Sequence, residues 1–418
     1  MQEQSSQYAV GLDVGTTTVR CVVGHIDGTS PVPTIIGVGT AENSGMRKGT
    51  VVNMVNTAQA IDKALEVAER MSGHQINEAT VSVNGSHIIG MSSRGVVAVG
   101  TQSHEINQDD IFRAEEAATV VQLPANREIL QVTPRSYQLD GQENIKDPMG
   151  MTGVRLEVDA HVITALVPHV KNLQKTCEMT QTMLHGMVPA GLAAARAVLS
   201  EQQMENGVIL IDFGGTTTNI AVFEEGDLQH VSVLPLGSVQ ITNDLAIGLK
   251  TDLDIAEVVK LEHATAVKRE ANAPEELSVT VKDESYSFKT EDIDMIVEAR
   301  LEEIFELINN ELKSIGRAAK LPGGAVLVGG GANLHGIAQY CKQSLQLPAR
   351  LGSLKGFGGV ADKIENPSFA TALGLMLLDT NSIRAKQGTT HTASEKGSAQ
   401  NLKNLSGHIG NLLKKFRT

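Results

Sequence analysis

The feature that most constrains the fold is an internal duplication. Residues 8–23 and 208–222 each contain an apolar run, an aspartate, a turn of glycine and threonine, and a second run rich in β-branched residues. Each copy predicts a strand, a tight turn and a second strand. Almost half of the chain separates the two copies, which is too far for a solenoid repeat. We therefore expect two homologous half-domains that face one another.

The composition is that of a large globular protein. With 418 residues, 41% hydrophobic and 20% charged, the chain predicts about two to four structural units and is neither disordered nor cysteine-stapled. A net charge of −13, 3% aromatic residues and no tryptophan argue against nucleic-acid binding. Cys21, Cys177 and Cys341 have no CxxC spacing, which disfavours a disulfide framework or a zinc site. Without a recognisable signal sequence or an apolar stretch of roughly 18 residues, we expect neither a secreted nor a transmembrane protein.

Two insertions interrupt the duplicated halves. Residues 79–159 carry short β-rich runs around a helix at 108–121, which predicts an inserted subdomain. The helix-rich segment 250–315 contains a polar β interlude at 276–290, and residues 386–401 have almost nothing to bury. The expected boundaries are 1–79, 160–200 and 371–385 for the first half-domain, 80–159 for the inserted subdomain, 201–245 and 318–370 for the second half-domain, 246–317 for its small insertion, 386–401 for a flexible linker and 402–418 for a terminal helix.

The two hairpins also predict a phosphate site. Glycine lets backbone N–H groups approach a phosphate, and threonine hydroxyls add donors. Asp13 and Asp212 end matching strands and would face one point, where paired carboxylates hold hydrated Mg²⁺ beside phosphate oxygens. A single D-x-G-T is explained equally well by turn chemistry, but two copies in matched strands favour the phosphate site.

A third glycine motif extends this site. Gly329, Gly330 and Gly331 follow a buried strand at 325–328, and the chain has no Walker loop. Two phosphate hairpins and a later strand with three glycines resemble the actin/Hsp70/sugar-kinase fold, in which the nucleotide lies between two halves. Glu257 and Lys260, three residues apart on one helix, are either an exposed ion pair or part of the clamp on the ribose and adenine. The predicted cofactor contacts are Asp13, Gly15, Thr16, Thr17, Thr18, Asp212, Gly214, Gly215, Thr216, Thr217, Glu257, Lys260, Gly329, Gly330 and Gly331, with Asp13 and Asp212 at the metal.

More specific motifs resemble the FtsA family, the actin-like proteins of bacterial cell division. They are GMRKGTV at 45–51, VNGSHI at 83–88 and DPMGMTGVR at 147–155, and the resemblance runs from residue 8 to about 379 and resumes at the terminal helix. It implies an α/β, actin-like, two-lobed ATPase fold with an FtsA-type inserted subdomain. It also implies ATP and Mg²⁺ binding, self-assembly into filaments, and other division proteins as partners. The implied function is an adaptor that tethers FtsZ filaments to the cytoplasmic face of the cell membrane at the division site.

Three departures from the family pattern bear on the nucleotide. Thr18 stands where the first hairpin of FtsA commonly has lysine, which removes a cationic phosphate contact. Thr216 and Asn219 interrupt the usual GGGT-x-D of the second hairpin. Val188 stands where hydrolytic relatives have a glutamate that orients water, so we expect a slow ATPase at most and name no catalytic residue.

The C-terminal segment predicts a membrane contact. Its apolar residues fall within an arc of roughly 100° of a helix, and its basic residues lie off that arc. A helix on anionic lipid is favoured over a core-facing helix because a linker separates the segment from the body. Single contacts would be weak, and a filament would add them together. The predicted membrane residues are Leu402, Leu405, Ile409, Leu412, Leu413, Phe416, Lys414 and Lys415.

One arginine is a candidate partner contact. Arg300 lies on a predicted helix at 296–308 that resembles the FtsA helix whose arginine contacts the C-terminal peptide of FtsZ. The alternative is a solvated ion pair with Glu303. Two other functions remain open, an actin-like type IV pilus assembly protein and a small-molecule kinase on the same fold. The amphipathic tail argues against the first, and the lack of a catalytic aspartate around Val188 argues against the second.

Overall fold

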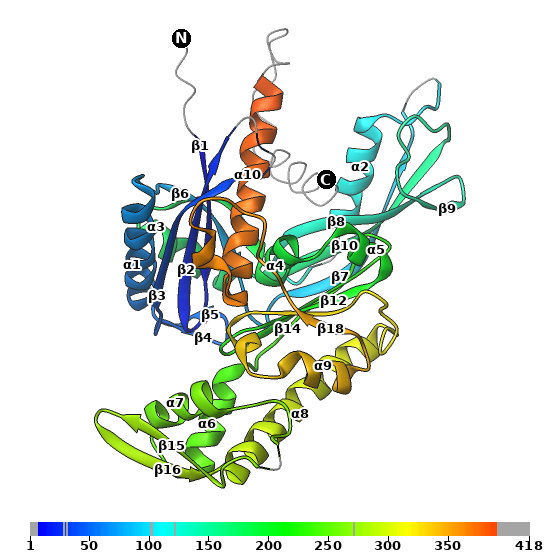
Figure 1. Ribbon diagram of the computed structural model, residues 1–418. Helices are drawn as coiled ribbons and strands as arrows, with labels where there is room; N and C mark the ends of the chain where they lie inside the picture. The colour runs from blue at the N-terminus through cyan, green and yellow to red at the C-terminus, as the bar shows by residue number, and fades with distance from the viewer. Residues whose placement is uncertain are drawn as a thin grey trace.

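The computed structural model describes residues 7–27, 30, 32–100, 103–120, 123–270 and 272–390. Two five-stranded sheets form the centres of two half-domains (Figure 1). The first has the order β11-β6-β1-β2-β3 and the second the order β14-β13-β12-β17-β18. When the order of the first sheet is listed from β3, the two sheets have the same pattern. Three antiparallel strands form a meander, and two further strands follow in parallel. The internal duplication is therefore confirmed at the level of sheet topology.

The strands of the first sheet are β1 (Gln7–Val14), β2 (Thr18–Ile26), β3 (Thr34–Glu42), β6 (Glu78–Val83) and β11 (Met183–Pro189). Helices α1 (Met54–Ser72) and α3 (Val167–Met179) pack together on one side, and α4 (Ala190–Val198) and α10 (Ala370–Thr390) pack on the other. A short hairpin, β4 (Met46–Arg47) and β5 (Thr50–Val51), precedes α1. A large apolar core joins these helices to the sheet.

The second sheet consists of β12 (Val208–Phe213), β13 (Thr218–Glu224), β14 (Asp227–Leu234), β17 (Gly324–Val328) and β18 (Ala349–Leu351), with α5 (Glu201–Asn206) and α9 (Ile337–Leu345) beside it. The predicted small insertion contains α6 (Ser238–Gly248), α7 (Leu253–His263), the hairpin β15 (Glu276–Val281) and β16 (Glu284–Lys289), and the long helix α8 (Thr290–Ser314). These elements share one core with the second sheet, so the insertion does not fold apart from it.

The inserted subdomain is a four-stranded sheet with one covering helix. Its order is β7-β10-β8-β9, from β7 (Ile89–Ala98), β8 (Arg127–Leu139), β9 (Gln142–Ile145) and β10 (Arg155–Leu166). Helix α2 (Gln108–Thr119) covers one face and completes a separate apolar core. The helix predicted at 108–121 thus ends two residues earlier than expected.

Two predicted boundaries of this subdomain differ from the structure. Strand β6, which we assigned to the insertion from residue 80 on, pairs in parallel with β1 and belongs to the first half-domain. Residues 160–166, which we assigned to the first half-domain, continue β10 within the inserted sheet. Both errors have one cause, since the composition of a strand does not reveal which sheet it joins.

The C-terminal part of the chain begins as a helix. Because α10 continues to Thr390, the first five residues of the linker predicted at 386–401 are helical. The remainder of that linker and the predicted membrane helix at 402–418 lie outside the described residues. Among the described residues, none of the helices is long and apolar enough to cross a lipid bilayer.

Candidate functional site

The two duplicated hairpins open onto one cavity between the half-domains. Its volume is about 470 Å³. All of the predicted cofactor contacts except Thr216 line this cavity, and sequence reasoning missed several further members. The residues that it missed include Arg20, Asn84, Asn219, Ser238, Ile241, Leu261, Glu262, Asn333, His335, Ser368 and Thr371.

The hairpins place equivalent residues in equivalent positions. Asp13 lies opposite Arg20 across β1 and β2, and Asp212 lies opposite Asn219 across β12 and β13. The Asn219 side-chain amide donates to Asp212 Oδ2 at 2.9 Å. Each turn also contains a glycine for which a Cβ atom would come within 3 Å of a backbone oxygen in the same turn. Glycine is therefore what allows each turn to close this tightly.

The two hairpins touch one another at the base of the cavity. A Cβ atom on Gly215 would lie 2.7 Å from Thr17 Cγ2, so a larger residue at position 215 would displace the Thr17 side chain. The Asn84 side-chain amide, just after β6, donates to Thr217 Oγ1 at 3.1 Å and so joins the two half-domains. The two halves are thus in direct contact at the point where both aspartates lie.

Burial strongly perturbs the carboxylates. Burial raises the pKa of Asp13, against the opposing effects of the Arg20 charge and of a 2.8 Å hydrogen bond from Ser82 Oγ. Burial and then the Asp13 charge raise the pKa of Asp212 to about 7. Two carboxylates that share one site cannot both ionise freely, which is the arrangement that a bound cation relieves.

Arg20 is the cation that the sequence analysis overlooked. Its guanidinium lies over the Phe369 ring at 5.6 Å, and burial lowers its pKa while Asp13 and Asp212 oppose that effect. Arg20 therefore supplies a cation to the first hairpin, although Thr18 stands where the family commonly has lysine. The hairpin register could have revealed this residue, because Arg20 follows Asp13 at the same spacing at which Asn219 follows Asp212.

Glu257 and Lys260 form a fixed cluster on α7 and are not an isolated surface pair. Lys260 Nζ donates to Glu257 Oε2 at 2.7 Å and to Thr242 Oγ1 at 2.9 Å. Thr242, on α6, in turn donates to the same carboxylate oxygen at 2.5 Å. The cluster presents a carboxylate and an ammonium group at the cavity wall, where hydroxyl groups of a ligand can bind.

The glycines after β17 permit close packing beneath the cavity. Gly329 has a φ of +87°, and a Cβ atom there would lie 2.5 Å from Asp212 Oδ1. A Cβ atom on Gly331 would lie 2.5 Å from the Phe213 ring. A side chain at either position would displace the second hairpin.

The structure locates the residues that depart from the family pattern in the second hairpin and at position 188. Asn219 Oδ1 and Thr216 Oγ1 are both buried without a hydrogen-bond partner in the described part of the chain. Asn219 lines the cavity, and its side-chain amide is held there by the hydrogen bond to Asp212. Val188 is buried in β11 and does not line the cavity among the described residues, so it offers no group that orients water.

Arg300 lies away from this cavity and has two carboxylate partners. Its Nε and Nη2 donate to Asp244 on α6 at 2.5 and 2.9 Å, and its Nη1 is paired with Glu303. The pair with Glu303 agrees with the alternative that sequence analysis left open. The bidentate pair with Asp244 was not recognised, because α6 is far away in sequence.

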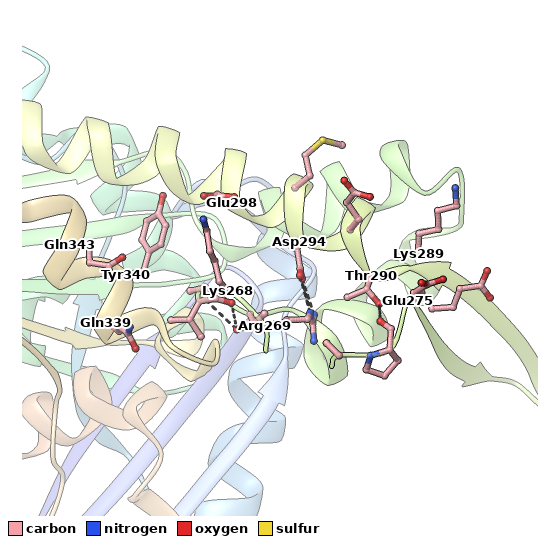
Figure 2. Close-up of a pocket in the computed structure, with 18 residues that line it drawn as sticks. Lys268, Arg269, Glu275, Lys289, Thr290, Asp294, Glu298, Gln339, Tyr340 and Gln343 are labelled. Carbon is pink, nitrogen blue, oxygen red and sulfur yellow. Dashed lines mark hydrogen bonds and ion pairs between the residues drawn. The ribbon is translucent and has the colours of Figure 1, made fainter. Parts of the chain in front are cut away.

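A wider groove of about 1300 Å³ lies elsewhere in the second lobe (Figure 2). It is bounded by the segment after α7, by the start of α8 and by α9, and it contains five carboxylates and three basic side chains. Arg269 is paired with Asp294 across it at 2.9 Å. None of the predicted site residues lines this groove. We therefore prefer the cavity between the hairpins as the ligand site, although the groove is larger.

The raised pKa of Asp212 predicts a pH-dependent stability. Between about pH 4 and pH 7 the folded protein binds more protons at Asp212 than the unfolded chain, so this residue lowers stability as pH rises. Asp212→Asn should therefore raise the free energy of unfolding at pH 8 by about 1–2 kcal/mol and have little effect at pH 4.5. The measurement is urea unfolding without nucleotide or Mg²⁺. Asp254→Asn, at an exposed aspartate, is the control, and equal pH profiles for Asp212→Asn and the wild type would contradict the prediction.

Known proteins similar to the chain agree with this architecture. Family models match at residues 209–374 (cell division protein FtsA) and 85–164 (the SHS2 domain inserted in FtsA). The chain is 36% identical to cell division protein FtsA of Pseudomonas aeruginosa, covering 90% of this chain and 89% of that one. It is 38% identical to FtsA of Bacillus subtilis, covering 89% and 83%.

Solved structures of lower identity share the fold. A PilM–PilN type IV pilus biogenesis complex matches with a TM-score of 0.64 at 17% identity, covering 89% of this chain and 98% of that chain. MreB5 of Spiroplasma citri bound to ADP matches with a TM-score of 0.52 at 13% identity, covering 93% and 99%. These likenesses establish an actin-like fold, and the closer sequence relatives establish that the chain belongs to the FtsA family of cell division proteins.

Proposed function

We propose that the protein binds ATP with Mg²⁺ between its two half-domains and acts in cell division as a polymerising adaptor that tethers FtsZ filaments to the cytoplasmic membrane. The observation that carries the nucleotide part is the cavity, where two glycine turns, Arg20 and two aspartates, the buried Asp212 and the half-buried Asp13, converge. Family membership supports the role in division. Partners, membrane attachment and position at the division site are parts of the proposal.

The residues present fit a nucleotide with its metal. Asp13 and Asp212 would hold Mg²⁺ through its water shell, and the unpartnered Asn219 Oδ1 can accept from such a water. The turn N–H groups and Arg20 would hold the phosphates, and Glu257 with Lys260 would bind the ribose. The bound metal would neutralise phosphate charge. Gly329 to Gly331 line the same cavity, and the open space beside Gly330 would let the adenosine lie against this backbone.

The same residues favour slow turnover. Hydrolysis requires a group that orients water against the γ-phosphate, and Val188 is apolar and buried. The small-molecule kinase alternative needs a catalytic carboxylate in that region, which Val188 does not supply. The pilus alternative rests on a structural likeness at 17% identity, whereas relatives above 30% identity are division proteins.

The nucleotide proposal predicts a cationic contribution from Arg20. Arg20→Gln should weaken ATP–Mg²⁺ binding by about 1.5–3 kcal/mol, because a charge-assisted hydrogen bond to phosphate is lost. Isothermal titration calorimetry measures the effect. Arg20→Lys keeps the charge and should retain part of the affinity, while Arg70→Gln, at an exposed arginine on α1, should retain all of it. Absence of ATP binding by the wild type, or turnover above about one per second, would contradict the proposal.

The membrane part rests on the segment 402–418, whose sequence combines an apolar stripe with basic residues and no acidic residue. Binding by one copy should be weak, since folding a short helix that contains Gly407 and Gly410 costs backbone entropy. A filament would present many such segments to one surface and increase the total affinity by avidity. This is a physical reason for self-assembly in an adaptor.

Glutamates at Leu405 and Leu412 should release the protein from anionic vesicles, because a charge on the apolar stripe opposes insertion. Vesicle sedimentation measures the release. The combined variant Asn404→Glu and Asn411→Glu, which adds the same two negative charges on the opposite side of the predicted helix, provides a matched comparison. Thermal unfolding should stay unchanged in all variants. A melting temperature lowered by several degrees would mean that the segment packs on the folded body and would exclude the membrane role.

We propose that the FtsZ C-terminal peptide, a short acidic and apolar segment, binds beside Arg300. Ile247, on α6 one turn after Asp244, is 77% exposed. Ile296 lies against the neighbouring Gly248 and one turn before Arg300 on α8. This surface thus combines apolar side chains with a guanidinium. A peptide carboxylate would bind Arg300 by displacing Asp244, which is itself a bidentate partner.

Competition with Asp244 predicts different effects on peptide binding for two substitutions. Arg300→Glu should weaken binding of the peptide by about 1.5–3 kcal/mol, whereas Asp244→Asn should leave it equal or stronger because it frees the guanidinium. Fluorescence anisotropy of a labelled peptide measures both variants, and ATP binding should change in neither. Equal affinity of Arg300→Glu and the wild type would leave Arg300 as a purely intramolecular ion pair.

A further inference from the structure

A second, smaller cavity lies at the seam between the inserted subdomain and the second half-domain. Strands β7, β8 and β10 of the inserted sheet pack on β14, and the cavity at this seam has a volume of about 280 Å³. It shares no lining residue with the cavity between the hairpins. The inserted subdomain supplies Ser92, Arg135, Ser136, Asn144, Lys146 and Asp159, and the second half-domain supplies Glu225, Asp227 and Gln229.

The guanidinium of Arg135 has only neutral partners at this seam. It is hydrogen-bonded to Ser92 Oγ, lies 3.4 Å from Gln229 Oε1, and lies 3.3 Å from His161 Nδ1. Among the described residues, no carboxylate oxygen lies within 4.0 Å of a guanidinium nitrogen of Arg135, the distance that an ion pair requires. Its Nε is buried and has no partner in the same part of the chain. Burial lowers the pKa of Arg135, so the surroundings do not compensate its charge.

The nearby acidic groups are engaged with other cations. Asp159 receives two hydrogen bonds from Arg94, at 2.9 and 3.1 Å. Asp227 Oδ2 accepts from Lys146 Nζ at 2.6 Å. Both carboxylates attract Arg135 from a distance, but each holds a closer partner. Glu225 is exposed at the rim of the cavity.

Even partial burial of an arginine without an anionic partner is costly, and a second unpartnered buried atom lies nearby. Of the buried side-chain atoms without a partner in the described residues, Arg135 Nε and His161 Nε2 lie on adjacent strands of the inserted sheet. His161 is 2% exposed, and burial followed by the Arg135 and His230 charges lowers its pKa to about 3. The imidazole is therefore neutral at neutral pH and supplies no negative charge to the guanidinium. A half-buried cation without an anionic partner suits a ligand that supplies the opposite charge.

We propose that the seam cavity binds a small oxyanion, a phosphate or carboxylate group, through the guanidinium of Arg135. The planar fork of arginine binds two oxygens of such a group at once. Ser136 and Asn144 provide neutral hydrogen-bond donors, and Lys146 provides a second cation that neutralises Asp227. A volume of about 280 Å³ is close to the lower end of small-molecule sites, so the ligand is small.

Binding would also affect the seam itself. Arg135 belongs to β8 of the inserted sheet, and Gln229, one of its neutral partners, belongs to β14 of the second half-domain. An anion on Arg135 would contact both sides of the seam. Its presence would therefore hold the inserted subdomain in one orientation against the second half-domain. The site is a ligand-dependent brace between two parts of the molecule.

The test compares full-length wild type and Arg135→Gln by calorimetry, with sodium phosphate and sodium acetate as probes and sodium chloride at equal ionic strength as reference. Phosphate can also bind between the hairpins, so Arg20→Gln is titrated in parallel. We expect Arg135→Gln to lose at least about tenfold in affinity for one class of phosphate sites that Arg20→Gln retains. Arg135→Lys should retain part of this affinity. Acetate binding would show that carboxylates suffice, and phosphate binding alone would restrict the ligand to phosphates.

Two further readouts separate a binding role from a structural one. Without added anion, Arg135→Gln should unfold at the same or a higher temperature than the wild type, because an uncompensated charge is removed. In the wild type, phosphate should slow amide hydrogen exchange in β8 and β14, and it should not do so in Arg135→Gln. Equal phosphate affinity in both proteins, an effect that chloride reproduces, or a melting temperature lowered by several degrees in Arg135→Gln would overturn the proposal.

Discussion

The candidate site depends on holding two aspartates, the buried Asp212 and the half-buried Asp13, close together where the half-domains meet. Each aspartate ends the first strand of a duplicated hairpin, and the hairpins touch at Thr17 and Gly215. Burial raises the pKa of both aspartates, and the Asp13 charge raises the pKa of Asp212 further. Arg20 and Asn219 oppose this effect from equivalent positions in the two hairpins. The two hairpins thus have similar backbones, but their aspartates have different partners. Asp13 faces the cation of Arg20, and Asp212 faces the amide of Asn219.

Much of this site could be predicted from the sequence because its signals are local. Glycine in a tight turn, an aspartate at a strand end and three glycines after a buried strand each report a backbone requirement within a few residues. For that reason the predicted set, with the exception of Thr216, lies around a single cavity. The actin-like fold followed from the same duplication, whose topology repeats in the two sheets.

The features that could not be predicted all depend on pairing between distant segments. The ion pair of Arg300 with Asp244 joins two helices, and the assignment of β6 to the first sheet depends on its parallel pairing with β1. The seam cavity requires β8 and β14 to pack together, although no motif marks either strand. Arg20 is intermediate, because counting the register of its hairpin would have located it.

A short connection links the cavity between the hairpins to the inserted subdomain. Asn84 follows β6, lines that cavity and donates to Thr217 of the opposite half-domain. A few residues later, the backbone carbonyl of His87 accepts a hydrogen bond from Arg127 Nη2 at 2.7 Å. The His87 ring stacks on the His169 ring, with 4.7 Å between the ring centres. These contacts tie the chain that enters the inserted sheet to the start of β8 and to α3, the helix that follows β10. The same short segment thus contacts the opposite half-domain at one end and the inserted sheet and α3 at the other.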